Sequence, residues 1–401
     1  MSANFHIADR RGLGLLRFAQ STIGTLFAPA YRAAFNSRRR RYLARRAPVA
    51  GAPVIAVGNI AMGGSGKTPV CCALYAAARK AKRRGAIVLK LGKDRRNYLD
   101  ELLIYASRLT TMDAAPPRVK HDEQSVVADL PSGVVCAHTN KMGGIKAMAA
   151  RKDVDFVIVD DAHQLYSLQP ALSICLLHPD DLKDRLFPRG MLREELEAAG
   201  RADFALMRED GSSGSAPAEM HGTFGLEERA VLPVADLIAP WIEMGSGERV
   251  SEGCGPLGAG VAFAGIGRPE SFEESLKKLQ VQLKAAARFP DHHEYSAADL
   301  HWLRKLGSDT GAGHFITTEK DGCRLLPLML RARYAQGYNV CWPAGLLPQP
   351  TVYLPNLIVA LEEIWPRMFF ARVNASLPDE LVSRFLEAIG ASGAPTVGIN
   401  T

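Results

Sequence analysis

A glycine-rich loop in front of Lys67 and Thr68 carries the strongest chemical signal in the sequence. The loop follows a short apolar run, Val54–Val57, which predicts a buried strand, and precedes a helical stretch, Pro69–Arg84. Glycines let successive backbone N–H groups turn toward an anion, and a helix start adds the positive end of its dipole. The pattern predicts a phosphate-binding loop in which Lys67 reaches the phosphates and Thr68 ligates Mg²⁺. The loop residues are Ala61, which stands where the usual pattern has its first glycine, and then Met62, Gly63, Gly64, Ser65 and Gly66.

Two adjacent carboxylates, Asp160 and Asp161, follow a second apolar run, Phe156–Val159. An apolar strand that ends in two aspartates is by itself also an ordinary strand end. Beside a phosphate-binding loop, however, a carboxylate at the tip of a neighbouring strand is placed to hold Mg²⁺, because a hard dication prefers oxygen ligands. We therefore predict that Thr68, Asp160 and Asp161 form the metal site.

A histidine pair, His292 and His293, lies in a short loop before a helix that Ser296 opens. Two adjacent loop histidines are more often surface or structural residues than catalytic ones. The pattern alone assigns them no chemistry.

Short apolar runs alternate with helical stretches from Pro53 onward, which predicts an α/β fold: a parallel sheet with helices on both faces. We expect a nucleotide-binding domain at 51–250, a smaller C-terminal α/β domain at 251–366 and a C-terminal extension at 367–401. The Gly/Ser/Pro-rich stretch 211–217 is expected to be a surface loop, and Asp379–Ile389 has helical periodicity. The further predicted strands are Ala86–Leu89, Ile174–Leu177, Phe204–Met207, Val261–Gly265, His314–Thr317 and Tyr338–Cys341.

The excess of positive charge is concentrated at the N-terminus. The chain has 49 Lys and Arg against 42 Asp and Glu, a formal net charge of +7, yet residues 1–52 contain a single acid, Asp9. The apolar segment Leu13–Phe35 is interrupted by Arg17 and Arg32, and its uncharged part is shorter than the roughly 20 residues that span a bilayer. We predict that residues 1–50 form an amphipathic, membrane-associated segment with an interfacial helix. A core helix before a solvated basic run and an Arg-rich transit peptide are the alternatives.

Seven cysteines are scattered along the chain without a Cys-x-x-Cys pair. This spacing indicates neither a zinc site nor a disulfide framework, and it fits a reducing compartment best.

Taken together, the motifs resemble the tetraacyldisaccharide 4′-kinases of lipid A biosynthesis. The resemblance covers about residues 12–365, and its motifs occur in the family's order. It implies a peripheral enzyme on the cytoplasmic face of the bacterial inner membrane, with an N-terminal membrane helix. The implied reaction transfers the γ-phosphate of ATP, with Mg²⁺, to the 4′-hydroxyl of a tetraacylated disaccharide 1-phosphate, an anionic acylated substrate, and we expect no nucleic-acid partner. The motifs are the loop from Val57 to Pro69, Asp160-Asp161, 185–194, 262–269, 289–295 and 318–321.

The same resemblance implies a catalytic pair, Asp100 and His292. In the family an aspartate acts as base together with a histidine. That histidine is the first one of the Asp-His-His loop, which is Asp291-His292-His293 in this chain. The corresponding residues here are Asp100, without the family's flanking Gly and Pro, and His292.

Three segments depart from the family pattern: 90–94, 118–122 and 162–165, where His163 stands two residues before the family's histidine position. All three lie around the acceptor or catalytic loops. A non-catalytic or substrate-altered nucleotide-binding paralogue at the membrane is therefore the alternative function. A P-loop ATPase or GTPase switch is a further alternative, although no guanine-reading Asn-Lys-x-Asp motif is present.

Overall fold

The computed structural model describes most of the chain and divides it into two compact units. The larger unit comprises Leu16–Tyr98, Tyr105–Asp236 and Asn374–Thr401, and the smaller one Met1–Leu15, Leu99–Ile104 and Leu237–Val373. Each unit is described here by itself. The described residues are 6–9, 24–62, 65–91, 99–109, 118–187, 189–209, 231–238, 242–243, 259–325, 368–371 and 373–391.

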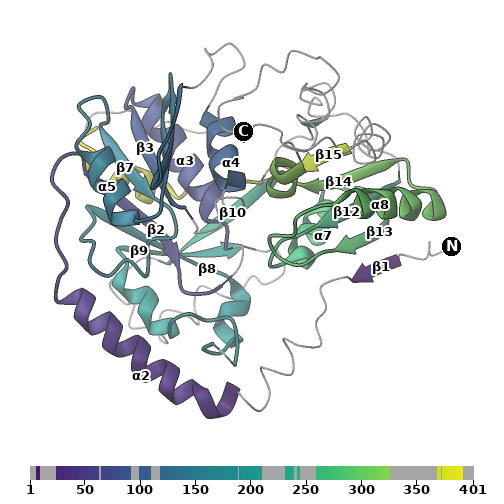
Figure 1. Cartoon of the computed structure of the whole chain (residues 1–401), viewed down its shortest axis with the longest axis horizontal. Helices are drawn as coiled ribbons and strands as arrows, with labels where there is room; N and C mark the ends of the chain where they lie inside the picture. The colour runs from purple at the N-terminus through teal and green to yellow at the C-terminus, as the bar shows by residue number, and fades with distance from the viewer. Residues whose placement is uncertain are drawn as a thin grey trace. The chain divides into compact units, whose positions relative to one another are not determined.

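A ten-stranded sheet forms the centre of the larger unit (Figure 1). Its strands are β2 (Val54–Asn59), β3 (Gly85–Lys90), β4 (Arg118–His121), β5 (Ser125–Leu130), β6 (Gly133–His138), β7 (Phe156–Val159), β8 (Leu172–Leu177), β9 (Phe204–Glu209), β10 (Val231–Ile238) and β16 (Val373–Ser376). They are ordered β16-β10-β9-β8-β2-β7-β3-β6-β5-β4. The five strands predicted for this region are all present. The sheet runs parallel from β10 to β6, which confirms the predicted parallel sheet, and β5 and β4 add an antiparallel edge that was not predicted. Two consecutive hairpins build that edge, and hairpins need only short turns.

Helices cover both faces of this sheet, as predicted. On one face, α5 (Lys141–Ala149) contributes Ile145 and Met148 to a core with alternate residues of β2, β3 and β7. On the other, Phe156 of β7 packs against Tyr75 of α3 (Lys67–Lys80) and Phe385 of α11 (Asp379–Ala388), with ring centroids 5.6 and 5.7 Å apart. Successive residues of a strand point to opposite faces of the sheet, so each strand contributes side chains to the cores on both faces.

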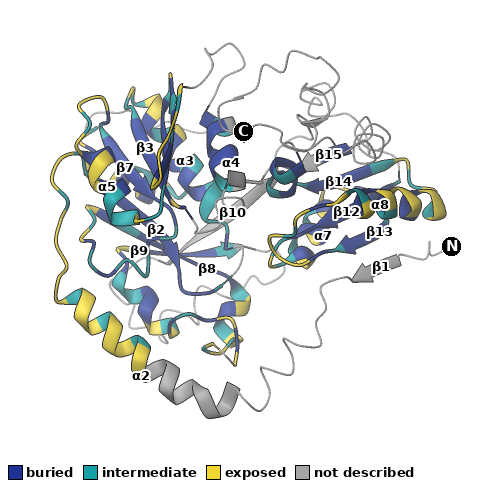
Figure 2. Cartoon of the chain, viewed as in Figure 1, coloured by how far each residue is buried: buried dark blue, intermediate teal, exposed yellow. Residues whose placement is uncertain are grey.

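The N-terminal helix α2 (Gly24–Leu43) lies along the larger unit, and its residues from 33 onward are mostly exposed (Figure 2). The apolar segment was predicted to end at Phe35, before the arginine run. The helix instead continues through Arg38–Arg41 to Leu43, because arginine is a good helix former. The Phe35 ring contacts that of Tyr166 edge-on, with centroids 6.2 Å apart, which attaches the helix to the unit.

The smaller unit has a six-stranded sheet of its own. Its strands are β1 (His6–Asp9), β11 (Ile242–Glu243), β12 (Gly260–Ala264), β13 (Leu283–Arg288), β14 (His314–Thr318) and β15 (Met368–Ala371), in the order β1-β13-β12-β14-β15-β11. Helices α7 (Pro269–Lys278) and α8 (Ala297–Thr310) accompany it. Ser296 caps α8 as expected, and its side chain accepts from the Asp299 N–H. Strands β1, β11, β13 and β15 were not predicted. The predicted strand Tyr338–Cys341 and loop 211–217 lie outside the described residues.

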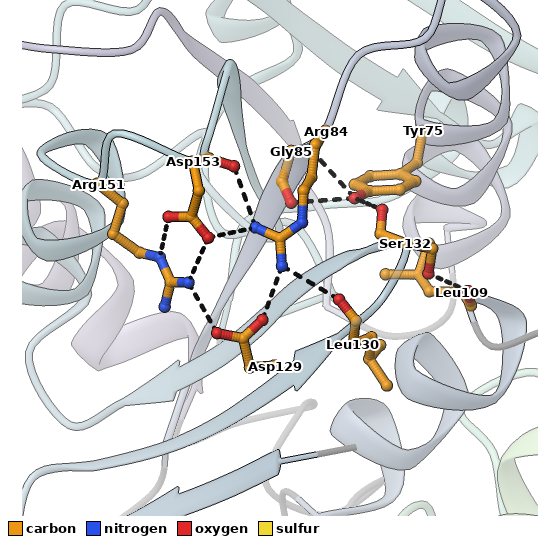
Figure 3. Close-up of polar contacts among 9 residues, drawn as sticks. All are labelled: Tyr75, Arg84, Gly85, Leu109, Asp129, Leu130, Ser132, Arg151 and Asp153. Atoms are coloured by element: carbon orange, nitrogen blue, oxygen red, sulfur yellow. Dashed lines mark hydrogen bonds and ion pairs between the residues drawn. The ribbon is translucent and has the colours of Figure 1, made fainter. Parts of the chain in front are cut away.

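A cluster of charged side chains connects Arg84, the residue before β3, with strand β5 and with the loop before β7 (Figure 3). The Arg84 guanidinium donates to Asp129 and Asp153, at 2.7 Å each, and Arg151 bonds the same two carboxylates. Hydrogen bonds from Arg151 lower the pKa of Asp153 to about 2. Asp153 is half exposed, so water screens much of this interaction.

Beside this cluster, the Tyr75 hydroxyl lies 2.9 Å from the Gly85 carbonyl oxygen and 2.8 Å from that of Ser132 (Figure 3). A β-carbon added at Gly133 would stand 1.6 Å from this hydroxyl. The turn between β5 and β6 therefore requires glycine at 133 for reasons of space.

Gly133→Ala should lower the free energy of unfolding by about 1–3 kcal/mol, the usual cost of overpacking a core. Urea unfolding of purified protein measures this. Gly313→Ala is the control, because an added β-carbon there meets nothing within 4 Å. Tyr75→Phe should offset part of the Gly133→Ala loss in the double variant, since it removes the clashing oxygen. Strict additivity of the two losses would show that the hydroxyl is not what excludes a side chain at 133.

Candidate functional site

The glycine-rich loop joins the carboxyl end of β2 to the start of α3. Gly66 caps α3 in the left-handed region, with φ +83°, and Lys67 and Thr68 are the first two helical residues. The first turn of α3 contains no acidic residue, so nothing there opposes an anion. Loop and helix start therefore have the geometry of a phosphate site. Gly63 and Gly64 lie outside the described residues.

Lys67 lies among oxygen atoms at the carboxyl edge of the sheet. Its Nζ donates to Asn59 Oδ1 at 3.1 Å and to Ser65 Oγ at 3.4 Å, and it stands 3.5 Å from Asp161 Oδ1. Asn59 is fully buried and its amide donates to the Ala61 carbonyl at 2.7 Å. The end of β2 thus fixes both the lysine and the entrance of the loop.

The two aspartates follow β7, which pairs with β2, and so reach the same edge. Asp160 is buried, and its Oδ2 accepts a hydrogen bond from the Tyr105 hydroxyl at 2.7 Å. Its Oδ1 is buried without a hydrogen-bond partner among the described residues. A buried carboxylate oxygen left in this way is suited to a cation.

Asp161 has a left-handed backbone, with φ +52°, and faces three cations. Arg193 Nη1 donates to its two oxygens at 3.1 and 3.2 Å, and Lys141 donates to the backbone carbonyls of Asp160 and Asp161 at 2.8 Å each. Burial acts to raise the pKa of Asp161, but Lys67, Lys141 and Arg193 outweigh it and hold that pKa well below its usual range. Asp161 is therefore ionised at any physiological pH.

These oxygens fit a magnesium ion. Mg²⁺ takes one or two carboxylates and completes its shell with water and phosphate oxygens. Thr68, Asp160 and Asp161 supply hard oxygen donors of that kind. Among the described residues no group of three or more His, Cys, Asp or Glu is placed to hold a metal ion.

The segment 185–194 supports the loop in a way that the sequence did not reveal. The Met62 N–H donates to the Met191 carbonyl at 2.7 Å, and the Arg193 N–H to the Ile60 carbonyl at 2.7 Å. Ala61 is buried and its backbone pairs with Leu192. Ala61 and Met62, predicted as loop residues, thus form the attachment of the loop to this segment.

A buried ion pair lies directly behind that attachment. Glu194 is 2% exposed, and Arg201 contacts both its carboxylate oxygens, at 2.7 and 2.9 Å. Gln164 Nε2 bridges Glu194 Oε1 and the Asn59 carbonyl at 3.1 and 2.9 Å. Arg201 lies outside every motif, seven residues after Glu194, and no sequence signal marks it as that residue's partner.

His163, the displaced histidine, is a buried structural residue. Its Nε2 lies 3.0 Å from the Ala198 carbonyl in the 3-10 helix η4 (Leu196–Arg201), and its backbone packs against Gly58. Burial, with the nearby positive charge of Arg201, lowers the pKa of His163 to about 4.

The histidine pair of the smaller unit divides into two roles. His293 stacks on Phe289 at 4.7 Å and its Nε2 lies 3.1 Å from Asp299 Oδ2, as a structural histidine would. His292 has φ +60°, and its backbone N–H donates to the Gly265 carbonyl. Its ring nitrogens lie 3.3 Å from Arg324 Nη2 and 3.4 Å from Lys320 Nζ. Asp291 Oδ1 lies 4.0 Å from its Nε2, so charges of both signs surround the ring.

Asp100 lies in the first turn of α4 (Leu99–Leu109), and its side chain is outside the described part of the structure. Residues Leu99–Ile104 group with the smaller unit, which also contains His292. The predicted pair therefore belongs to one unit, and its catalytic role stays a prediction.

Comparisons with known proteins identify relatives of the chain. A family model described as tetraacyldisaccharide-1-P 4′-kinase matches residues 21–349. A tetraacyldisaccharide 4′-kinase of Phenylobacterium zucineum is 36% identical over 72% of this chain and 80% of that protein. A tetraacyldisaccharide 4′-kinase of Hyphomonas neptunium is 32% identical over 80% of this chain and 87% of that protein. The solved structure of Aquifex aeolicus LpxK in complex with ATP aligns with a TM-score of 0.56 at 21% identity, covering 94% of this chain and 99% of that one, and so shares the fold.

The buried neutral state of His163 should make stability depend on pH. Its pKa is lower in the folded chain than the roughly 6.5 of an unfolded one, so below pH 6.5 protons favour unfolding. We expect this residue to remove about 2 kcal/mol of unfolding free energy between pH 7 and pH 5. In His163→Gln that part of the pH dependence should vanish, while the exposed-site control His301→Gln should retain it. Equal slopes in urea unfolding for His163→Gln and the wild type would contradict the buried neutral assignment.

Proposed function

The chain belongs to the tetraacyldisaccharide-1-P 4′-kinase family, and from that premise we propose that it transfers the γ-phosphate of ATP to the 4′-hydroxyl of a tetraacylated disaccharide 1-phosphate. It is an ATP-dependent kinase of lipid A biosynthesis. One observation carries the proposal: Lys67, at the start of α3, faces Asn59 and Asp161 at the carboxyl edge shared by β2 and β7.

The triphosphate would be held by the N-terminal end of α3 and by the residues just before it. The backbone N–H groups near Gly66 and the hydroxyl of Ser65 donate to phosphate oxygens, and Lys67 moves from Asp161 to the β- and γ-phosphates. Thr68, Asp160 and Asp161 would hold Mg²⁺. When bound, Mg²⁺ would offset the negative charge that develops on the phosphates during transfer.

Asp100 would accept the proton of the attacking hydroxyl. The hydroxyl oxygen forms its bond to the γ-phosphorus as the bond to ADP breaks, and the carboxylate takes the proton. His292, which lies beside Lys320 and Arg324, would orient or charge-tune Asp100. The shared unit of Asp100 and His292 supports this pairing.

The anionic acylated substrate and the membrane surface fit the N-terminal helix. In the described part of the chain no helix is long and apolar enough to cross a bilayer. The last turns of helix α2 contain the basic residues Arg38–Arg41, three of them exposed, and exposed Arg45 and Arg46 follow the helix. We propose attachment to anionic lipid at the cytoplasmic face of the inner membrane, rather than to nucleic acid, because the family's substrate is an acylated, anionic lipid and an apolar stretch precedes these arginines.

Lys67→Ala should abolish the thermal stabilisation that ATP-Mg²⁺ confers, because the motif supplies no other mobile cation to the phosphates. Differential scanning fluorimetry measures the shift. Lys80→Ala, at the other end of the same helix, is the control and should leave the shift unchanged. An undiminished shift in Lys67→Ala would remove the loop from the proposal.

Asp100→Ala and His292→Ala should each lower kcat strongly, while ATP affinity stays near that of the wild type. If the two form one proton-accepting unit, the double variant should be little worse than either single one, since residues that act together are grossly non-additive. Phosphate transfer from ATP to a tetraacyldisaccharide 1-phosphate gives the readout. Multiplicative losses would indicate independent roles. A wild-type chain that binds ATP but transfers no phosphate would favour the non-catalytic or substrate-altered paralogue.

A further inference from the structure

An exposed turn of the larger unit combines apolar and basic side chains that the phosphate site does not use. We call it the Phe187 loop and define it as the described residues 185–187 and 189–191. Four large hydrophobic residues are exposed in the described part of the chain, and two of them, Phe187 at 39% and Met191 at 38%, belong to this turn. Arg185 and Arg189 are exposed beside them.

This exposure is built into a well-bonded turn. The Asp184 carboxylate accepts from the backbone N–H groups of Arg185 and Met191 at 2.7 and 2.9 Å, and the Phe187 N–H donates to the Leu192 carbonyl at 2.8 Å. At Gly190 a β-carbon would stand 2.2 Å from Asp184 Oδ1, so the turn closes tightly there. The chain is thus held in a shape that presents Phe187 and Met191 outward.

Inward and outward side chains alternate along the turn. Leu186 and Leu192 pack with the core formed by Ile60, Ala61 and Leu177. Between them, Phe187 and Met191 are exposed. Two large apolar side chains exposed in one tightly held turn are suited to a contact surface.

Arg185 and Arg189 give the turn a positive charge. Neither arginine forms an ion pair with a described residue. The Asp184 carboxylate accepts hydrogen bonds from two backbone N–H groups instead. Positive charge beside exposed apolar groups is complementary to the interfacial region of an anionic bilayer, which offers phosphates above acyl chains.

The surface is also continuous with α2. Phe35 and Arg39 of α2 line one small pocket together with Leu186 and Glu197. Helix α2 itself exposes Arg38, Arg40 and Tyr42, the last at 42%. The proposed membrane helix and the Phe187 loop are therefore neighbours within one unit.

We infer that the Phe187 loop is a second membrane-contacting element, in which Phe187 and Met191 enter the interface of an anionic bilayer and Arg185 and Arg189 pair with lipid phosphates. The inference rests on the proposed function at a membrane surface. It adds a consequence for the reaction, since the Met191 carbonyl bonds the Met62 N–H of the phosphate-binding loop. Lipid contact and nucleotide site are then joined through one short stretch of backbone.

Sedimentation of the full chain with vesicles tests the inference, using phosphatidylcholine alone and phosphatidylcholine enriched in phosphatidylglycerol. Phe187→Ser should weaken binding to the anionic vesicles about tenfold, from the loss of a buried aromatic side chain. Arg185→Gln/Arg189→Gln should weaken it by about fivefold per arginine and flatten its salt dependence. The matched controls are Leu279→Ser, 37% exposed in the smaller unit, and Lys80→Gln/Lys305→Gln, which removes equal charge elsewhere. Unchanged binding in both loop variants would overturn the inference.

A second measurement does not depend on loss of binding. Phe187→Trp retains the apolar bulk, so it should bind as the wild type does and show fluorescence quenching by lipids with brominated acyl chains beyond that of the native tryptophans. Absence of the additional quenching would place residue 187 outside the bilayer. ATP-dependent thermal stabilisation should persist in all loop variants. A wild-type chain without phosphate transfer, but with vesicle binding that the loop variants lose, would sink the proposed function and leave the membrane contact standing.

Discussion

The functional edge of the protein depends on β2 lying beside β7 in a parallel sheet. Only in that arrangement does Lys67, which follows β2, meet Asp161, which follows β7, at 3.5 Å. Two parallel neighbours bring their carboxyl ends to one edge, where the positive end of α3 also points. The path of the backbone thus places the lysine, the carboxylates and the start of α3 at one edge without the help of a ligand.

The same edge concentrates charge that the surrounding structure must balance. Asp161 is surrounded by Lys67, Lys141 and Arg193, while Asp160 is buried and bonded by Tyr105 on one oxygen only. Buried charges are tolerated where they are paired and hydrogen-bonded. The Glu194–Arg201 pair, linked through Gln164 to the end of β2, meets this condition and holds the entrance of the phosphate-binding loop.

The segment 185–194 connects two surfaces with different chemistry. Its inner side bonds the backbone of Ile60 and Met62 and carries Arg193 to Asp161. Its outer turn presents Phe187 and the two arginines. A lipid kinase has to bring a water-soluble nucleotide to an acceptor anchored in a bilayer. A turn that is bonded to the nucleotide loop and apolar at its tip suits that requirement.

Much of the fold and of the nucleotide site could be predicted from the sequence, because those features are local. The strand, glycine loop and helix start lie within the contiguous stretch from Val54 to Pro69, and the apolar runs around β7, β8, β9, β12 and β14 predict strands through side-chain burial alone. The antiparallel edge, strand β1 and the arginine run inside α2 were missed, since pairing partners and helix ends depend on what packs against them. Only the tertiary structure decided that Arg201 neutralises Glu194, that His163 is structural and that His292 faces Lys320 and Arg324. Each of these contacts depends on the three-dimensional path of the chain and on the exclusion of water, neither of which any local residue pattern encodes.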